Sequence, residues 1–237
     1  MTIAELGREA TFGAGGAEPY AHALRREGRL TLVRSDAGGE SSGSHGEGST
    51  EPGSGDYDLG RWMAAADDVD RALLAAERGP VLDIGCGPGR MVEAGIALGL
   101  VALGIDVSSA AVAVARNAGL PVLRRTVFER LPRERHWGTA LLLDGNIGIG
   151  GDPVRLLNRC RELLSATGAV IVEASPRDEA DSVFSAHVVD DHGRASSDFP
   201  WAEVGADAMA RHAASAGLRV DQEWRVDGRV FARLVRA

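Results

Sequence analysis

The stretch VLDIGCGPGR, residues 81–90, decides the fold of this chain. Its first four residues are mostly apolar, which is typical of a buried strand, and glycines follow at positions 85, 87 and 89. A helical pattern begins after the last glycine. A glycine-rich turn between a strand and a helix lets the backbone come close to a ligand, with free N–H groups and the helix dipole pointing at it. The stretch therefore predicts an α/β fold with a ligand-binding turn.

Two charged residues distinguish this turn from a dinucleotide-binding one. The dinucleotide fingerprint requires a small residue five places after its first glycine, and Arg90 occupies that place here. Asp83 lies two residues before the first glycine, where it would repel a phosphate and favour a ligand with an amino group and a sulfonium. A nicotinamide-dependent oxidoreductase on a similar sheet stays the alternative, and both residues disfavour it.

Helix and strand patterns alternate from residue 58 to about residue 175. Helices are expected over 58–77, over 91–98, from Ser108 or Ser109 to about Gly119, and after the Asp152-Pro153 pair; strands are expected over 81–84, 101–105, 122–123, 140–143 and 170–172. A helix over about 202–216 and two strands, 218–224 and 230–235, follow around an Asp227-Gly228 turn. This order predicts a Rossmann-like, doubly wound sheet of seven strands, mostly parallel, with an antiparallel C-terminal hairpin strand.

The chain divides into two predicted parts. Residues 1–57 form a variable N-terminal segment with a short helix near 19–27, a possible strand over 30–33 and a Gly/Ser-rich linker over about 37–56, which has too few apolar side chains to fold. Residues 58–237 form the ligand-binding domain, with a substrate or lid insertion at about 177–201 that contains a possible hairpin over 183–189. Four aromatic residues line a small-molecule site or pack the lid: Trp62, Phe184, Phe199 and Trp201.

Composition narrows the function classes. The net charge is −8, which argues against a nucleic-acid partner, and all 26 basic side chains are arginines. Without lysine, a Schiff-base lysine and a Walker-type phosphate loop are excluded. No apolar run is long enough to cross a membrane, and the two cysteines suit a reducing compartment. We therefore expect a cytoplasmic monomer or homodimer that acts on a small molecule.

The segment Asp83-Ile84-Gly85-Cys86-Gly87-Pro88-Gly89 resembles the first motif of class I S-adenosylmethionine-dependent methyltransferases, and the chain is similar to an actinobacterial, small-molecule type of that family. The resemblance implies that Asp83 and the turn, with Gly85, Cys86, Gly87 and Gly89, contact the methionine part and the ribose of S-adenosylmethionine, whose product is S-adenosylhomocysteine. It also implies an acid after the second strand for the two ribose hydroxyls. Asp106 is in that place, followed by Val107.

The third strand departs from the family pattern. The family often has an acid there that holds the adenine amino group, and this chain has Thr126 at the position. Backbone groups near Val127 and stacking on Phe128 are expected to hold the adenine instead. Packing in the core is the alternative interpretation of Phe128.

The methyl acceptor is expected beyond the fourth strand, where Asp144 and Asn146 face the methyl group and Asp144 also reaches the cofactor. Methyl transfer to O, N or C is an in-line displacement that depends on alignment, and a hydroxyl or amine acceptor can also need a base. Candidate bases are Asp144, Glu173, His187 and His192. No metal is expected, because the sequence has no convincing ligand cluster. A non-catalytic or repurposed protein that binds the cofactor is a third alternative.

Overall fold

The computed structural model describes residues 18–26, 28–35, 55–57 and 64–237 of the chain. Its elements, in chain order, are α1 (Glu18–Arg26), β1 (Leu30–Ser35), β2 (Gly55–Tyr57), α3 (Asp68–Ala76), β3 (Val81–Ile84), α4 (Arg90–Ala97), β4 (Ala102–Asp106), α5 (Ser109–Asn117), β5 (Val122–Arg124), β6 (Trp137–Leu142), the 3-10 helix η2 (Asn146–Gly151), α6 (Pro153–Leu163), β7 (Leu164–Ala174), β8 (Asp181–Asp190), β9 (Phe199–Val204), α7 (Ala206–Ser215), β10 (Leu218–Val226) and β11 (Arg229–Arg236). None of the described helices is long and apolar enough to cross a membrane.

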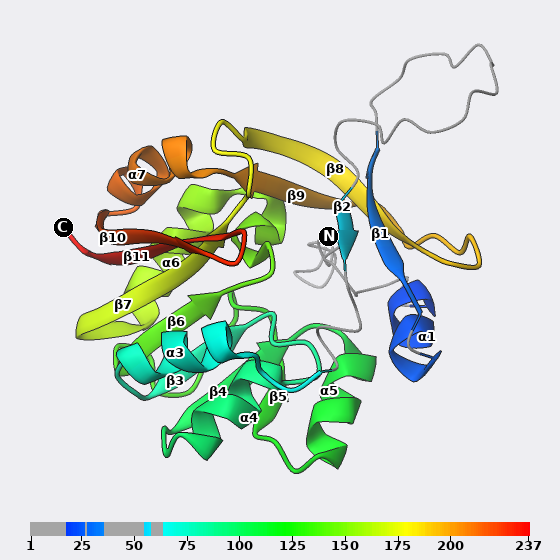
Figure 1. Cartoon of the computed structure of the whole chain (residues 1–237), viewed down its shortest axis with the longest axis horizontal. Coiled ribbons are helices and arrows are strands. Elements are labelled where there is room, and N and C mark those ends of the chain that lie inside the picture. The colour runs from blue at the N-terminus through cyan, green and yellow to red at the C-terminus, as the bar shows by residue number, and fades with distance from the viewer. Residues whose placement is uncertain (1–17, 27, 36–54, 58–63) are drawn as a thin grey trace, which may run out of the picture.

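The main sheet has seven strands in the order β10-β11-β7-β6-β3-β4-β5 (Figure 1). The five strands β7, β6, β3, β4 and β5, in their order across the sheet, pair in parallel with their neighbours. Strand β11 is antiparallel to both β7 and β10. The sequence-based prediction of a mostly parallel Rossmann-like sheet with an antiparallel C-terminal hairpin is confirmed. All four residues of β3 are buried, because this strand lies inside the sheet with a helix layer on each face.

Alternate residues of the central strands pack against different helix layers. Val81 and Leu141 belong to an apolar cluster with residues of α3, α4 and α5. Leu82 and Ile84 belong to a second cluster with residues of α6 and α7. The period of two along a strand thus divides the core into two layers, as expected for a doubly wound sheet.

Helix N-caps mostly follow the sequence signals. The Ser108 side chain accepts from the N–H of Ala111, and the Asp152 side chain accepts from the N–H of Arg155 at 2.9 Å. The helix expected over 58–77 begins only at residue 68, because Asp67 caps it in a capping box with Asp70. Residues 64–67 are not helical, and 58–63 lie outside the described residues.

A second, four-stranded antiparallel sheet has the order β2-β1-β8-β9 and joins the N-terminal segment to the insertion at 177–201. In Figure 1 these strands lie together beside the main sheet, with α1 below β1. The hairpin expected over 183–189 is wrong: β8 runs unbroken because β1 pairs with one of its edges and β9 with the other. Gly55 and Asp56, expected in the linker, belong to β2, and residues 37–54 lie outside the described ones.

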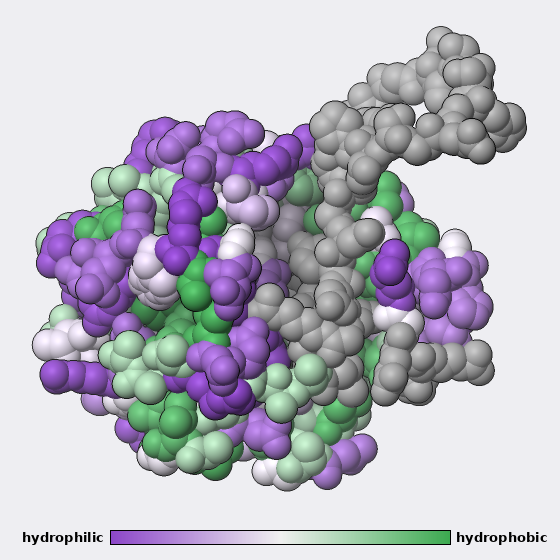
Figure 2. Space-filling model, in the orientation of Figure 1, coloured by the Kyte–Doolittle hydropathy of each residue, from purple (hydrophilic) through white to green (hydrophobic). Residues whose placement is uncertain are grey.

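Surface hydropathy is mixed. In the view of Figure 2, hydrophilic residues cover much of the described surface around α7, and hydrophobic residues occur in small areas between them. Large exposed hydrophobic side chains include Ile96, Leu98 and Val101, which lie close together in sequence around the end of α4.

Candidate functional site

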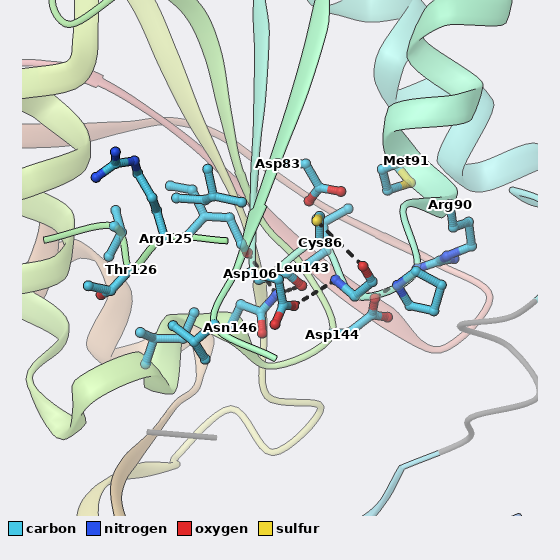
Figure 3. A pocket seen from close by; sticks show the side chains of 18 of the residues that line it. Asp83, Cys86, Arg90, Met91, Asp106, Arg125, Thr126, Leu143, Asp144 and Asn146 are labelled. Atoms are coloured by element: carbon cyan, nitrogen blue, oxygen red, sulfur yellow. Dashed lines mark hydrogen bonds and ion pairs between the residues drawn. The ribbon is translucent and has the colours of Figure 1, made fainter. Parts of the chain in front are cut away.

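A cavity lies at the carboxyl ends of β3, β4 and β6, where parallel sheets of this kind bind their ligands (Figure 3). Tyr20 of α1 and Trp201 of β9 also line it, so that the second sheet and its helix contribute to the same cavity. The lining residues are Tyr20, Asp83, Ile84, Gly85, Cys86, Gly87, Pro88, Arg90, Met91, Ile105, Asp106, Val107, Arg125, Thr126, Val127, Leu143, Asp144, Asn146, Ile149, Gly150 and Trp201.

The glycines of the turn have positive φ angles, and neighbouring atoms lie close to where their side chains would be. Gly85 has a φ of 72°, and a Cβ there would lie 2.7 Å from Nδ2 of Asn146. The N–H of Gly87, at a φ of 53°, donates to Oδ2 of Asp106 at 2.9 Å. Gly89 does not line the cavity. A Cβ on it would meet the side chain of Leu120, so the close contact of Gly89 is with another residue of this protein rather than with a ligand.

Asp106 ends β4 beside the turn. Its Oδ1 accepts from the N–H of Ser108 at 2.7 Å, and its Oδ2 accepts from Gly87. Burial raises the pKa of this carboxyl, while the backbone N–H bonds of Ser108, Gly87 and Val107 oppose that rise. The two oxygens still have acceptor capacity towards the cavity, as binding of a hydroxyl pair requires.

Asp83 is a buried carboxyl inside the cavity, 5% exposed. Burial raises its pKa to about 7; the Arg90 guanidinium lowers the pKa, and the carboxylates of Asp144, Asp106 and Asp70 raise it. Among the residues that the structure describes, none forms a hydrogen bond with the Asp83 carboxyl. A cationic ligand group would supply the partner that this carboxylate lacks.

The loop after β6 contains the two residues predicted to face the methyl group. Asp144 has a φ of 52°; its Oδ2 accepts from Nη2 of Arg90 at 2.7 Å, and its N–H donates to Glu173 at 2.9 Å. The Asn146 amide donates to the carbonyls of Ile84 and Gly85 at 2.9 and 3.1 Å. Both side chains line the cavity, and Asn146 also fastens the turn.

The residues expected near the adenine divide into two groups. Val107, Thr126 and Val127 line the cavity. Phe128 does not; its ring packs against the core and has the Arg155 guanidinium 4.3 Å from its centroid. Cys86 lines the cavity with a buried thiol whose pKa is raised by burial.

His187, the third residue expected to be catalytic, lies outside the cavity. Its buried neighbours Ala186 and Val188 face the core, so the imidazole is on the other face of β8. There Nδ1 lies 2.9 Å from Oγ of Ser35 and 3.2 Å from Oδ1 of Asp198. That position gives its predicted catalytic role no support.

Two further predicted candidates also lie outside the cavity lining, Glu173 and His192. In the described part of the chain, ligand-type atoms of His22, Asp190 and His192 lie within 4.8 Å of one another. Arg194 donates to Asp190 from Nε at 2.7 Å, and a guanidinium beside this carboxylate opposes binding of a cation.

The sequence missed Tyr20 as a cavity residue. Its side chain is 2% exposed, and its hydroxyl lies 3.3 Å from the place of a Cβ on Gly87. Burial and the Asp106 carboxylate raise its pKa. Of the aromatic residues singled out, Trp201 lines the cavity, Phe184 and Phe199 pack within the second sheet, and Trp62 lies outside the described residues.

No model of a known protein family matches the sequence, and no curated protein matches it. Solved structures do share the fold. A methyltransferase of Bacteroides fragilis, solved with S-adenosylhomocysteine, is 18% identical over 92% of this chain and 93% of its own, with a TM-score of 0.69. The CcbJ methyltransferase of Streptomyces caelestis is 17% identical over 74% and 92%, with a TM-score of 0.57. A sugar N-methyltransferase of Streptoalloteichus is 19% identical over 86% and 99%, with a TM-score of 0.55. The chain thus has the fold of S-adenosylmethionine-dependent methyltransferases.

Proposed function

We propose that this chain binds S-adenosylmethionine in the cavity at the ends of β3, β4 and β6 and transfers its methyl group to O, N or C of a small molecule. One observation carries the proposal. The same cavity contains a buried carboxyl that lacks a hydrogen-bond partner among the described residues, a glycine turn with positive φ angles, and a second carboxyl at the end of β4. Phosphate would be repelled there, which disfavours a nicotinamide dinucleotide.

The lining residues fit the parts of this cofactor. Asp83 suits the cationic amino group, and Asp106 suits the two ribose hydroxyls, because each needs acceptor oxygens. Val107 and Val127 offer an apolar surface for adenine, with Thr126 as the polar group beside it. Structures with this fold that contain S-adenosylmethionine or S-adenosylhomocysteine support the assignment.

When bound, the cofactor supplies an electrophilic methyl group on a sulfonium. The chain's own residues then have to hold the acceptor in line and exclude water. Tyr20 and Trp201 line the cavity from the second sheet and its helix, and we assign water exclusion to them. Asp144 is the proposed acceptor-orienting carboxylate, because it lines the cavity and its position is fixed by Arg90. Sugar and glycopeptide N-methyltransferases are among the solved structures with this fold, and they make a nitrogen acceptor the first class to test.

Calorimetric titration with S-adenosylmethionine, S-adenosylhomocysteine and NADH tests the cofactor assignment. The first two should bind and NADH should not. Asp106→Ala should abolish or severely weaken binding, whereas the control Asp198→Ala removes an exposed carboxylate just before β9 and should leave binding unchanged. Binding of NADH in preference to S-adenosylhomocysteine would refute the assignment.

Methyl transfer needs its own test, because a protein can retain the cofactor site without the reaction. Labelled S-adenosylmethionine should be incubated with amine, hydroxyl and carbon-acid acceptors, and transfer to each class measured. A labelled product that disappears in Asp144→Asn supports the enzyme. Tight cofactor binding without transfer to any acceptor would favour the non-catalytic alternative.

A further inference from the structure

Five charged residues next to the cavity form a closed ring of hydrogen bonds, in which one link is the backbone N–H of Asp144. Arg90 donates to Asp70 and, at 2.7 Å, to Asp144. The Asp144 N–H donates to Glu173 at 2.9 Å. Arg229 donates to both oxygens of Glu173 at 2.8 Å and from Nη1 to Asp70 at 2.9 Å, which closes the ring. We call these five residues the charged ring.

The charged ring joins elements that are far apart in sequence. Asp70 is on α3, Arg90 begins α4, Asp144 follows β6, Glu173 is on β7 and Arg229 begins β11. Only two of its members, Arg90 and Asp144, line the cavity, and the side chains of Asp70 and Arg229 are 0% and 8% exposed. Each guanidinium bridges two carboxylates of the charged ring, so substitution of one arginine removes the cation that those two acids share.

We propose that Arg229 and Asp70 are positioning residues, which fix the cofactor cavity through Glu173 and Arg90 without touching the ligand. This proposal rests on the proposed function for its ligand, but its geometry stands independently. Arg229 holds Glu173, and Glu173 accepts the backbone N–H of Asp144. Asp70 holds Arg90, and Arg90 holds the Asp144 carboxylate. Asp144 is thus fixed at both its backbone and its side chain.

The hydrogen bonds of the charged ring hold the backbone of Asp144 in an unfavourable conformation. A non-glycine residue at a φ of 52° is strained relative to ordinary helix or strand and persists where its surroundings hold it. Two residues later, Asn146 donates to the carbonyls of Ile84 and Gly85. A shift of Asp144 would therefore move Asn146 and loosen the glycine turn. Loss of Arg229 should weaken cofactor binding from a position outside the cavity.

Arg233 offers a matched control on the same strand. It lies four residues after Arg229 and likewise bridges two carboxylates, Glu77 and Asp221, both at 2.8 Å. Among the described residues, Arg233 lies outside the cavity lining, and its ion pairs are with Glu77 and Asp221 rather than with the charged ring. Arg229→Met and Arg233→Met each remove a guanidinium that joins two carboxylates, and only the first opens the charged ring. The ion pairs of Arg233 are the more exposed, so the place where exchange rises is compared between the two variants, and not only its size.

Hydrogen exchange of the ligand-free protein is the decisive measurement. In Arg229→Met, exchange should rise in peptides that cover residues 143–151 and 85–90, relative to both the wild type and Arg233→Met. Affinity for S-adenosylhomocysteine should fall about tenfold or more in Arg229→Met and change less than about twofold in Arg233→Met. Arg229→Lys, which keeps the charge but not the forked geometry, should lie between.

The outcomes separate the two proposals. Equal exchange over 143–151 in the Arg229→Met and Arg233→Met proteins overturns the positioning role, whatever the affinities are. A rise spread evenly over the whole chain also overturns it, because it indicates a general loss of stability. If exchange changes as expected but the wild type does not bind S-adenosylhomocysteine, the proposed function fails and the positioning role stands. Glu173→Gln, nearly isosteric, gives the same test if Arg229→Met does not fold.

Discussion

Binding of S-adenosylhomocysteine should depend on pH through Asp83. The free protein holds this carboxyl in the cavity with a pKa of about 7, mainly because it is buried. The cationic amino group of the ligand pairs only with the ionised form. Below neutral pH most of the protein has Asp83 protonated, and binding to those molecules has to release that proton.

The pKa sets the size of the effect. With a pKa of about 7, about a tenth of the protein is binding-competent at pH 6 and about nine tenths at pH 8. The apparent Kd should therefore be about tenfold weaker at pH 6 than at pH 8. At pH 7 about half a proton should be released per ligand bound.

Isothermal calorimetry in two buffers of different ionisation enthalpy measures both quantities. Asp83→Asn should bind weakly and with no pH dependence in this range. Asp106→Asn should also bind weakly but retain the pH dependence of the wild type, since the ligand groups assigned to it are neutral hydroxyls. An affinity that stays constant between pH 6 and 8 in the wild type would refute the reasoning.

Three further predictions concern single residues. Folding raises the pKa of Asp83 from 3.8 to about 7, so the folded protein binds this proton more tightly than the unfolded chain does, and the wild type loses stability as pH rises from about 4 to 7. Asparagine is not ionised and avoids this loss. In chemical denaturation, the free energy of unfolding of Asp83→Asn should therefore exceed that of the wild type by about 4 kcal/mol at pH 8 and by little near pH 4. Gly85→Ala should cost about 1–3 kcal/mol and abolish cofactor binding, whereas Gly99→Ala, at a φ of 78° with open space around it, should cost only the backbone part; equal thermal shifts would contradict the clash with Asn146. Tyr20→Ala should weaken S-adenosylhomocysteine binding more than Tyr20→Phe, because the buried ring covers the turn; calorimetry showing equal, wild-type affinities would exclude that role.

Local signals predicted the part of the site that lies on consecutive elements. The turn at 85–89 and Asp106 follow two strands that pair in parallel, so their meeting at one sheet edge follows from the strand order. Capping residues such as Ser108 and Asp152 also act within a few positions of themselves. Periodicity and turn chemistry are sufficient for such features.

Local sequence signals could not predict the site residues whose partners are far away in the sequence. Tyr20 reaches the cavity only because β1 pairs with β8, and nothing near Tyr20 specifies that pairing. The unbroken course of β8 depends on both of its neighbouring strands, so its polar composition gave the wrong expectation. Arg229 follows a hairpin turn, and its partners come from a helix and another strand.

The pairing of β1 with β8 also constrains the order in which the protein is assembled. Ser35 and His187, which meet across these strands, are 152 positions apart. On a growing chain, the parallel strands from β3 to β7 are made before β8 can offer its edge to β1. Closing so long a segment is entropically costly and slow compared with local helix formation. Helix α1, although synthesised before the strands of the main sheet, is thus among the last elements to dock, and the cavity acquires its Tyr20 wall late in folding.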